Sequence, residues 1–275
     1  MSSDPNRRAL PGFSLTLGYT MVYLSVLVLI PIAACFTKAA SLTWSEFWAA
    51  VWSERALNAY ALTFGASLAA ASINLVLGVL IAWVLVRYTF PFKRVVDALI
   101  DIPLALPTAV AGLVYSGLYV KSGWLGQFLM PLGIQAVYSR LAIVLVLTFI
   151  CLPFVVRTVQ PVLEDMDAET EEAAGSLGAT RGQTFRRIIL PTLFPAMITG
   201  FAVAFARCLG EYGSVVFVSG NFPYQTEIAP VLIVARLEEF AYGEATAIAV
   251  VLLTMSFAML IVINLLESWS RRRVA

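Results

Sequence analysis

Six stretches of the chain carry no charged side chain, and they alternate with short segments in which the charges gather. These stretches are residues 9–37, 56–86, 102–120, 141–156, 188–206 and 245–266. A helix needs about 20 apolar residues to cross the hydrocarbon core of a bilayer, and each stretch meets or approaches that length once neutral flanks are included. Backbone groups in lipid must bond within their own segment, so the stretches are expected to be helices. The pattern predicts an all-α integral membrane protein with about six transmembrane helices.

The Lys and Arg residues predict the orientation of these spans. With six crossings, one side of the membrane receives twelve basic residues and the other receives five. The richer side carries Arg7, Arg8, Arg87, Lys93, Arg94, Arg157, Arg181, Arg186, Arg187, Arg271, Arg272 and Arg273. The other side carries Lys38, Arg55, Lys121, Arg140 and Arg236. Because cytoplasmic loops carry the excess of positive charge, the N and C termini are both expected in the cytoplasm.

Composition excludes several classes of protein. The 275 residues are 60% hydrophobic and 13% charged, whereas soluble domains are about 45–50% apolar and about 25% charged. A soluble enzyme is therefore excluded. The net charge of +1 gives no indication of a nucleic-acid partner. The chain contains no histidine, which removes Ser-His catalysis and histidine metal sites. No catalytic residue, metal or cofactor is expected.

The three cysteines and the tryptophans are interpreted as packing residues. Cys35, Cys151 and Cys208 are widely spaced in apolar stretches, which favours buried small hydrophobic side chains over a disulfide framework or a metal cluster. Residues 38–57 place Trp44, Trp48 and Trp52 on one face of a short helix, as in segments that lie at the membrane interface. The loop 220–242 is expected to be irregular and to contain a short re-entrant helix.

The connection from 157 to 191 is the most polar part of the chain. Residues 164–177 lack proline and are expected to form a helix that ends with Gly178 at C′. Thr180 and Gln183 have the spacing of a capping box, which predicts a second helix start. Pro191 is expected to separate this loop helix from the fifth span.

A small apolar patch is predicted at the tip of this hairpin, from Ala173, Ala174 and Leu177. Such a patch, held off the membrane by charged neighbours, suits docking into the groove of another protein. Alternatively, the loop helix is simply solvated and its patch packs on the protein's own spans. The residues alone leave both interpretations open.

The same loop resembles a family motif. Glu172-Ala173-Ala174, then Gly178, then Ile188-Ile189-Leu190-Pro191 is similar to the E-A-A-x3-G-x9-I-x-L-P loop of ABC importer permeases. The resemblance implies a type I ABC importer permease-like fold in which this coupling loop is seated on a cytoplasmic ATPase subunit. The expected coupling residues are Glu172, Ala173, Ala174, Leu177, Gly178, Arg181, Ile188, Leu190 and Pro191. The chain has no phosphate-binding G-x-x-x-x-G-K-[ST] motif, so ATP hydrolysis is expected in that partner and not here.

Other segments resemble the oxyanion importers within this family. Residues 97–113 and 206–213, with Ser219-Gly220-Asn221, are similar to sulfate/thiosulfate and molybdate permeases, and residues 7–18 and 153–161 favour the CysT-type sulfate/thiosulfate permeases. The resemblance implies a multi-pass protein of the bacterial inner (plasma) membrane. It also implies four kinds of neighbour: a second similar permease subunit in a heterodimer, two ATPase subunits, a periplasmic sulfate/thiosulfate-binding protein, and the lipid bilayer. A molybdate or other oxyanion permease is the alternative.

Two segments are candidates for the translocation path or gate. Pro103 and Pro107 interrupt regular helix, and a helix beginning near Thr108 would point free N–H groups at an anion. The same prolines also suit a plain helix start, and that alternative stays open.

Arg207 and Glu211 lie one turn apart in the fifth span, where ionised groups usually face an interior pathway. Gly210 and Gly213 beside them would permit a bend or a close backbone approach. A pathway role is favoured over a purely structural ion pair.

These predictions divide the chain into a cytoplasmic N-terminal tail (1–12), a transmembrane permease domain (13–267) that includes the coupling loop 157–191, and a basic cytoplasmic tail (268–275).

An ion-coupled secondary transporter is a hypothesis from a different class. It would require buried acids within the spans, for which Glu211 is the clear candidate, and it would leave the cytoplasmic hairpin unexplained. An intramembrane enzyme is disfavoured, because the chain offers no histidine and no paired acids deep in the spans.

Overall fold

The computed structural model describes residues 13–274, without the side chains of Ser14, Ala168 and residues 266–274, and its regular elements are all helical. They are α1 (Phe13–Leu24), η1 (Ser25–Leu29), α2 (Ile30–Ala39), α3 (Trp44–Val51), α4 (Glu54–Arg87), α5 (Lys93–Ile100), α6 (Ile102–Ala105), α7 (Thr108–Tyr119), α8 (Gly126–Leu129), η2 (Met130–Leu132), α9 (Arg140–Glu164), α10 (Ala168–Ser176), α11 (Arg181–Thr184), η3 (Phe185–Ile189), α12 (Leu190–Leu209), α13 (Val215–Val218), α14 (Ala229–Glu238) and α15 (Tyr242–Val274). The predicted all-α class is confirmed. The predicted tail 1–12 lies outside the described residues.

Five helical segments within the described residues are long and apolar enough to cross a membrane. They are Leu15–Ala39, Glu54–Arg87, Arg140–Glu164, Arg181–Leu209 and Tyr242–Leu265. These segments coincide with five of the six predicted spans. The 268 boundary of the predicted basic tail does not coincide with a helix end, because α15 continues to Val274.

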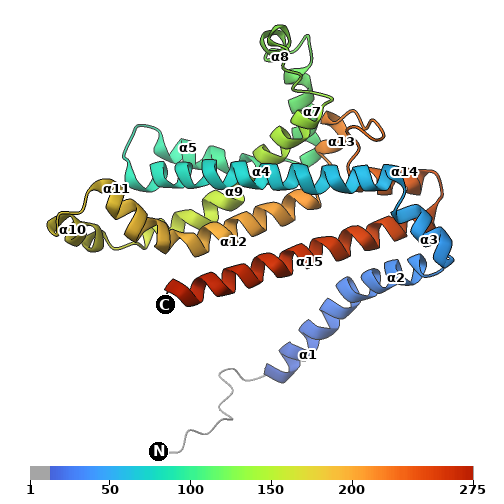
Figure 1. The fold of residues 1–275 in the computed structure, drawn as a ribbon, viewed down its shortest axis with the longest axis horizontal. Helices are drawn as coiled ribbons and strands as arrows, with labels where there is room; N and C mark the ends of the chain where they lie inside the picture. Colours follow the sequence, from blue (N-terminus) through green and yellow to red (C-terminus); the bar gives the residue numbers. More distant parts are fainter. Residues whose placement is uncertain (1–12, 275) are drawn as a thin grey trace, which may run out of the picture.

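The third predicted span, 102–120, is not one continuous helix. Pro107 has an extended backbone (ψ 129°) and separates the four-residue α6 from α7, which begins at Thr108 as predicted. The twelve residues of α7 span about 18 Å at the α-helical rise, well short of the roughly 30 Å hydrocarbon core. In Figure 1, α5 follows the end of α4, whereas α7 turns across the long bundle axis. The two prolines thus interrupt the third predicted span as expected, but the helix that follows them is too short to cross the hydrocarbon core by itself.

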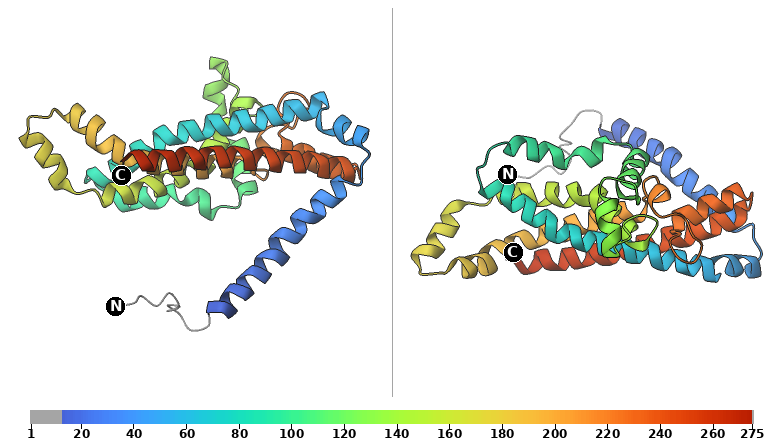
Figure 2. Two further views of the ribbon diagram at one scale, coloured as in Figure 1. Left: turned by 60° about the horizontal axis from the view of Figure 1, so that its bottom comes forward. Right: turned by 90° about the horizontal axis from the view of Figure 1, so that it is seen from above.

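The core of the molecule is the packing of α4 against α9 and α12, which run alongside one another (Figures 1 and 2). The face that α4 buries consists largely of small side chains. Ala66, Ala70, Ala71 and Ala82 are all buried there, together with Gly78. The branched and large side chains of the partners, among them Val155 and Phe205, fill the space that these small residues leave. Small residues at such an interface allow helix backbones to approach closely.

The first apolar segment stands apart from this core. Helix α1 leans away from the bundle, whereas α2, in the second half of the same segment, packs against α15 (Figure 2). None of the most hydrophobic window of Leu15–Ala39 is buried within the chain. An apolar helix with no protein cover within its own chain is suited to contact lipid or another subunit.

The tryptophan face of 38–57 is confirmed. Helix α3 opens with a capping box between Thr43 and Glu46, which places Trp44 and Trp48 on one side with ring centroids 5.3 Å apart. Trp52 follows and stacks on Trp48 at 5.9 Å. Hydrogen bonds from Thr43 lower the pKa of Glu46, so this cap is fixed with its carboxylate ionised.

Gly78 marks a close approach of α4 to α9. A Cβ built at Gly78 would lie 2.7 Å from the Val155 Cγ1 atom, whereas one built at Gly65 on the same helix would meet nothing within 4 Å. We predict that Gly78→Val overpacks the interface and destabilises the protein by about 1–3 kcal/mol. Thermal unfolding of the purified protein measures this, with Gly65→Val as the control. Equal melting temperatures for the two variants would contradict the proposed close packing.

Candidate coupling loop and translocation path

The loop between α9 and α12 contains the predicted hairpin, with a different first boundary. Helix α9 extends to Glu164, and α10 begins only after Asp167, whose side chain accepts a hydrogen bond from the Glu169 N–H at 3.0 Å. The expectation of one helix over 164–177 was therefore wrong at its start. Asp167 is a good N-cap residue, and its bond to the backbone begins a separate helix.

The end of α10 agrees with the prediction. Gly178 has φ +80°, and the Ala179 N–H donates to the carbonyl oxygen of Ala174 at 3.0 Å. This is the left-handed C′ position at which glycine is favoured, because a Cβ there is strained. The chain reverses at Gly178 and places α10 and α11 side by side as a hairpin.

The capping box of the second loop helix is also confirmed. The Gln183 N–H donates to Thr180 Oγ1 at 3.3 Å, and the Thr180 N–H donates to Gln183 Oε1 at 2.8 Å. Pro191, however, does not separate the loop helix from the span. The helix runs without a break from Arg181 to Leu209. The turn before Pro191, residues 185–189, is widened to a π-helical turn, which accommodates the missing N–H of the proline.

The residues of the predicted apolar patch at the hairpin tip differ in their exposure. Ala174 is buried, whereas Leu177 is 89% exposed and Glu172 and Ala173 are exposed beside it. A hollow of about 390 Å³ lies behind Leu177, and its lining is Ala174, Leu177, Gly178, Ala179, Gln183, Thr184, Arg187 and Ile188. Leu177 therefore does not pack on the spans of its own chain. An exposed leucine at a fixed turn is suited to contact a partner.

The remaining predicted coupling residues also differ in their exposure. Arg181 is exposed at the start of α11, whereas Ile188, Leu190 and Pro191 are half-buried at the base of the hairpin.

An ion pair that the sequence analysis missed joins the hairpin to the core. Arg87, the last residue of α4, pairs with Glu171 on α10, and its Nη2 atom lies 3.6 Å from the Met166 sulfur. The Arg87 guanidinium also lies over the Trp83 ring at 5.5 Å. Trp83 in turn contacts Phe185 at the base of the hairpin, with ring centroids 5.7 Å apart. Both arms of the loop are thus connected to the same end of α4.

The structure brings the two predicted path segments together. A Cβ at Gly213 would lie 2.4 Å from Thr108 Oγ1, and one at Gly112 would lie 2.4 Å from the Ser214 carbonyl oxygen. The Ser116 hydroxyl donates to the Phe217 carbonyl oxygen at 2.8 Å. Helix α7 is therefore packed along the turn that follows α12, with glycines at the points of closest approach. Gly210 has open space around it, so no close backbone approach requires a glycine there.

The prolines that precede α7 lie in different surroundings. Pro103 is buried in α6, which packs against α9, whereas Pro107 is exposed at the N-cap of α7.

Arg207 and Glu211 form the predicted pair, and the carboxylate has further partners. Arg207 Nη1 donates to Glu211 Oε2 at 2.6 Å. The other carboxylate oxygen accepts the N–H and the hydroxyl of Ser214, each at 3.0 Å. Glu211 is only 2% exposed, whereas the Arg207 side chain is 35% exposed. The Glu211 carboxylate thus fixes the turn that follows α12, whereas the Arg207 guanidinium stays partly exposed.

A second arginine network, whose side chains are partly exposed, escaped the sequence analysis. Arg157 on α9 donates to both carboxylate oxygens of Asp101 at 2.9 and 2.6 Å, and its Nη1 atom lies 2.6 Å from Asp97 Oδ1. Gln160 accepts a further bond at 2.7 Å. This network fixes the start of the broken third crossing to α9. Two acids four residues apart, with an arginine directly after a charge-free stretch, were the only available signal.

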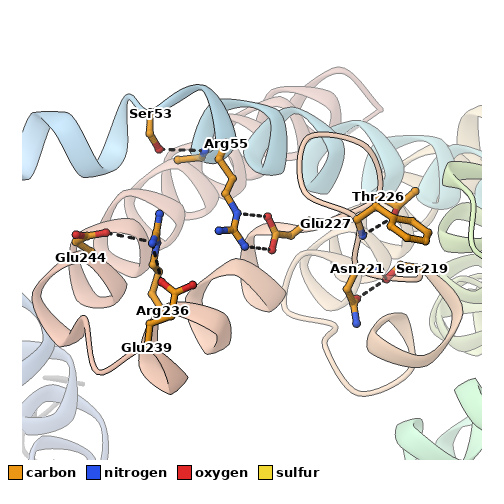
Figure 3. A network of polar contacts seen from close by, with 11 residues as sticks. Ser53, Arg55, Ser219, Asn221, Thr226, Glu227, Arg236, Glu239 and Glu244 are labelled. Carbon is orange, nitrogen blue, oxygen red and sulfur yellow. Dashed lines mark hydrogen bonds and ion pairs between the residues drawn. The ribbon is translucent and has the colours of Figure 1, made fainter.

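The loop before α14, which the sequence analysis places on the outer side, is held by ionic and polar contacts (Figure 3). Arg55 at the start of α4 makes two bonds of 2.7 Å to the buried carboxylate of Glu227. The Ala229 N–H donates to Thr63 Oγ1 at 2.8 Å. Arg236 pairs with Glu239 at 2.7 Å and lies 3.4 Å from Glu244. The predicted irregular loop with a short helix is confirmed, and α14 is that helix.

Two of the three cysteines meet in the core. Cys151 and Cys208, far apart in the sequence, lie on α9 and α12 with 2.8 Å between their sulfur atoms, and both are buried. Both are free thiols, so their interpretation as buried small side chains is confirmed, whereas Cys35 is only half-buried. Within the described residues, no group of three or more Cys, Asp or Glu side chains is placed to hold a metal ion.

Residues 74–275 match the family of binding-protein-dependent transport system inner membrane components. The sulfate transport system permease protein CysT of Synechocystis sp. is 51% identical over 253 residues, covering 92% of this chain and 88% of that protein. The protein of the same name from Salmonella typhimurium is 45% identical over 274 residues, which is 100% of this chain and 99% of that one.

The fold is similar to those of solved ABC transporters. A bacterial ABC transporter involved in the import of the acidic polysaccharide alginate matches with a TM-score of 0.76 at 18% identity, over 94% of this chain and 95% of that chain. The MetNI methionine ABC transporter matches with a TM-score of 0.55 at 19% identity, over 85% of this chain and all of that chain.

The environment of Glu211 predicts a large effect of its removal. We expect Glu211→Gln to destabilise the protein by about 3 kcal/mol, because it leaves Arg207 unpaired and weakens both bonds from Ser214. Glu239→Gln breaks an ion pair of similar length at a carboxylate that is 48% exposed, and should cost at most about 1 kcal/mol. Chemical unfolding of the two purified variants compares these values, and equal stabilities would refute the structural role of Glu211.

Proposed function

This chain belongs to the family of binding-protein-dependent transport system inner membrane components, and we propose that it is the transmembrane permease subunit of an ATP-driven sulfate or thiosulfate importer. The observation that carries the proposal is the near full-length identity to sulfate permeases. The coupling motif lies in a hairpin whose tip is exposed. Within this proposal, residues 13–267 form the permease domain, 157–191 form its coupling loop, and 1–12 and 268–275 are cytoplasmic tails.

The proposed ATPase contact is the tip of the α10 hairpin. Leu177 would insert into a groove of the ATPase, and the turn at Gly178 would hold it there. Movement of the hairpin would reach the core along two routes, the Arg87–Glu171 pair and the continuous helix from Arg181 to Leu209. Because the chain carries no phosphate-binding motif of its own, nucleotide hydrolysis belongs to the partner.

The proposed assembly pairs this chain with a second, similar permease in a heterodimer. The uncovered apolar surface of Leu15–Ala39 supports a further subunit, since a helix with no cover from its own chain can pack on a neighbour. A periplasmic binding protein would deliver the anion to the outer end of the bundle. One structural neighbour was solved in complex with an alginate pentasaccharide-bound periplasmic protein. The expected location is the bacterial inner membrane, with both termini in the cytoplasm.

The proposed path passes where α7 meets the turn after α12. There Thr108 and Gly213 are in contact, and Arg207 lies a few residues away with its charge balanced by Glu211. A near-neutral passage of hydrogen-bonding groups would admit a dianion without holding it tightly, which suits a site that must release its substrate.

We predict that Gly178→Asp abolishes ATP-driven sulfate uptake by the reconstituted complex. The substitution strains a backbone at φ +80° and places a charge beside Leu177 at the proposed contact. Uptake of radiolabelled sulfate into vesicles that contain ATP measures the effect. Gly182→Asp on α11 adds the same charge four residues away, at an exposed glycine with open space, and should retain most uptake. Full uptake by the Gly178 variant would refute the coupling role.

We further predict that Arg207→Ala reduces uptake at least tenfold while the complex still assembles. The residual Glu211 charge beside the proposed path would repel a dianion. Co-purification of the ATPase and permease subunits checks assembly, and sulfate uptake checks transport. Loss of assembly would instead assign the pair a structural role. Competition by molybdate in the same assay distinguishes the sulfate permeases from the alternative oxyanion class.

A further inference from the structure

A hollow between α4 and α9 near the outer end of the bundle is not part of the path described above. It has a volume of about 330 Å³, and its lining is Asn58, Ala61, Leu62, Gly65, Ala66, Arg140 and Val144. The only charged group in this lining is the guanidinium of Arg140. The hollow therefore combines a half-open space, one full positive charge on an exposed side chain and an amide group.

The Arg140 side chain is anchored and yet keeps most of its donors. Its Nε–H donates to the Gln225 carbonyl oxygen at 2.9 Å, which fixes the guanidinium against the outer loop. No carboxylate among residues 13–274 with described side chains pairs with Arg140, and both Nη atoms lack a protein partner there. A guanidinium has five N–H donors, so four remain for a ligand. This planar fork matches the oxygen atoms of an oxyanion.

The charges nearby do not cancel that of Arg140. The carboxylate of Glu227 in the same outer loop already makes two bonds to Arg55, as Figure 3 shows. Glu54 precedes Asn58 by one turn of α4, and its side chain is not part of the lining. Arg140 is also the first residue of the 25-residue helix α9, whose N-terminal dipole adds to the positive potential.

The remaining lining leaves room for a ligand close to the α4 backbone. Ala61, Gly65 and Ala66 are small, and a Cβ built at Gly65 would meet nothing within 4 Å. Asn58 uses one amide N–H on the Glu54 carbonyl oxygen at 2.8 Å, so its second N–H and its oxygen stay available. The hollow thus offers hydrogen-bond donors on its polar side and open space on the other.

We propose that this hollow binds a tetrahedral oxyanion dianion, with sulfate as the probe, on the outer side of the permease. Arg140 supplies the charge and Asn58 a further hydrogen bond. The inference rests on the proposed function, since it assigns the anion a binding site at the outer end. A single arginine gives weak and reversible binding, which suits an anion in transit.

Equilibrium binding of radiolabelled sulfate to the complete transporter tests this site. The complex is placed in phosphatidylcholine nanodiscs without nucleotide and without the binding protein, at constant ionic strength. We expect saturable binding that weakens tenfold or more in Arg140→Gln, the loss expected for charge-assisted hydrogen bonds. Gly65→Leu fills the hollow while it leaves the bond from Arg140 to Gln225 intact, and should also abolish binding. Lys121→Gln removes an exposed positive charge outside the hollow and should bind as the unchanged protein does.

Three results would overturn the site. They are the absence of saturable binding, binding by the Arg140 and Gly65 variants that equals binding by the unchanged protein, and loss of sulfate binding when phosphatidylglycerol is added, which would assign the hollow to a lipid phosphate. ATP-driven uptake by the same preparation separates the two proposals. Uptake without binding in the hollow refutes this inference alone, whereas absence of uptake in the complete system refutes the proposed function.

Discussion

The close packing of α4 against α9 and α12 is the constraint on which the other features of this protein depend. At 34 residues α4 is about 50 Å long, and its small buried side chains let two neighbouring backbones approach it. Its two ends carry the connections to the loops. Arg55 holds the loop before α14 through Glu227, and Arg87 holds the α10 hairpin through Glu171. Helix α4 therefore connects the hairpin to the opposite end of the bundle.

Ion pairs also connect the long helices of the bundle to its loops and short helices. A charge in a low-dielectric surrounding is costly unless it is paired, and the arginines Arg55, Arg157 and Arg207 each meet a carboxylate supplied by a loop or a short helix. These pairs fix irregular segments to regular ones. Arg157 orients the broken third crossing, and Glu211 shapes the turn that α7 packs on. Glu211 is thus bound on one oxygen by Arg207 and on the other by Ser214.

The interrupted third span lies where the proposed anion path runs. Backbone that is not helical is tolerated at membrane depth only where protein covers it or where it lines a cavity. Here Pro107 ends one short helix, and the next one, α7, is covered by the turn of Gly213 and Ser214. The proposed sulfate path and the separate hollow at Arg140 both lie beside such irregular backbone.

Features set by neighbouring residues could be predicted from the sequence alone. The apolar stretches determined five long helices, Gly178 determined a left-handed turn, and Thr180 with Gln183 determined a helix start, because each depends on contacts within a few residues. Contacts between distant segments could not be predicted in this way. The pairing of Arg157 with Asp101, the meeting of Cys151 with Cys208, and the packing of Thr108 on Gly213 depend on which helix faces turn toward one another. Hydrophobic periodicity is almost uninformative in spans that are apolar on every side, so only tertiary packing decided these contacts.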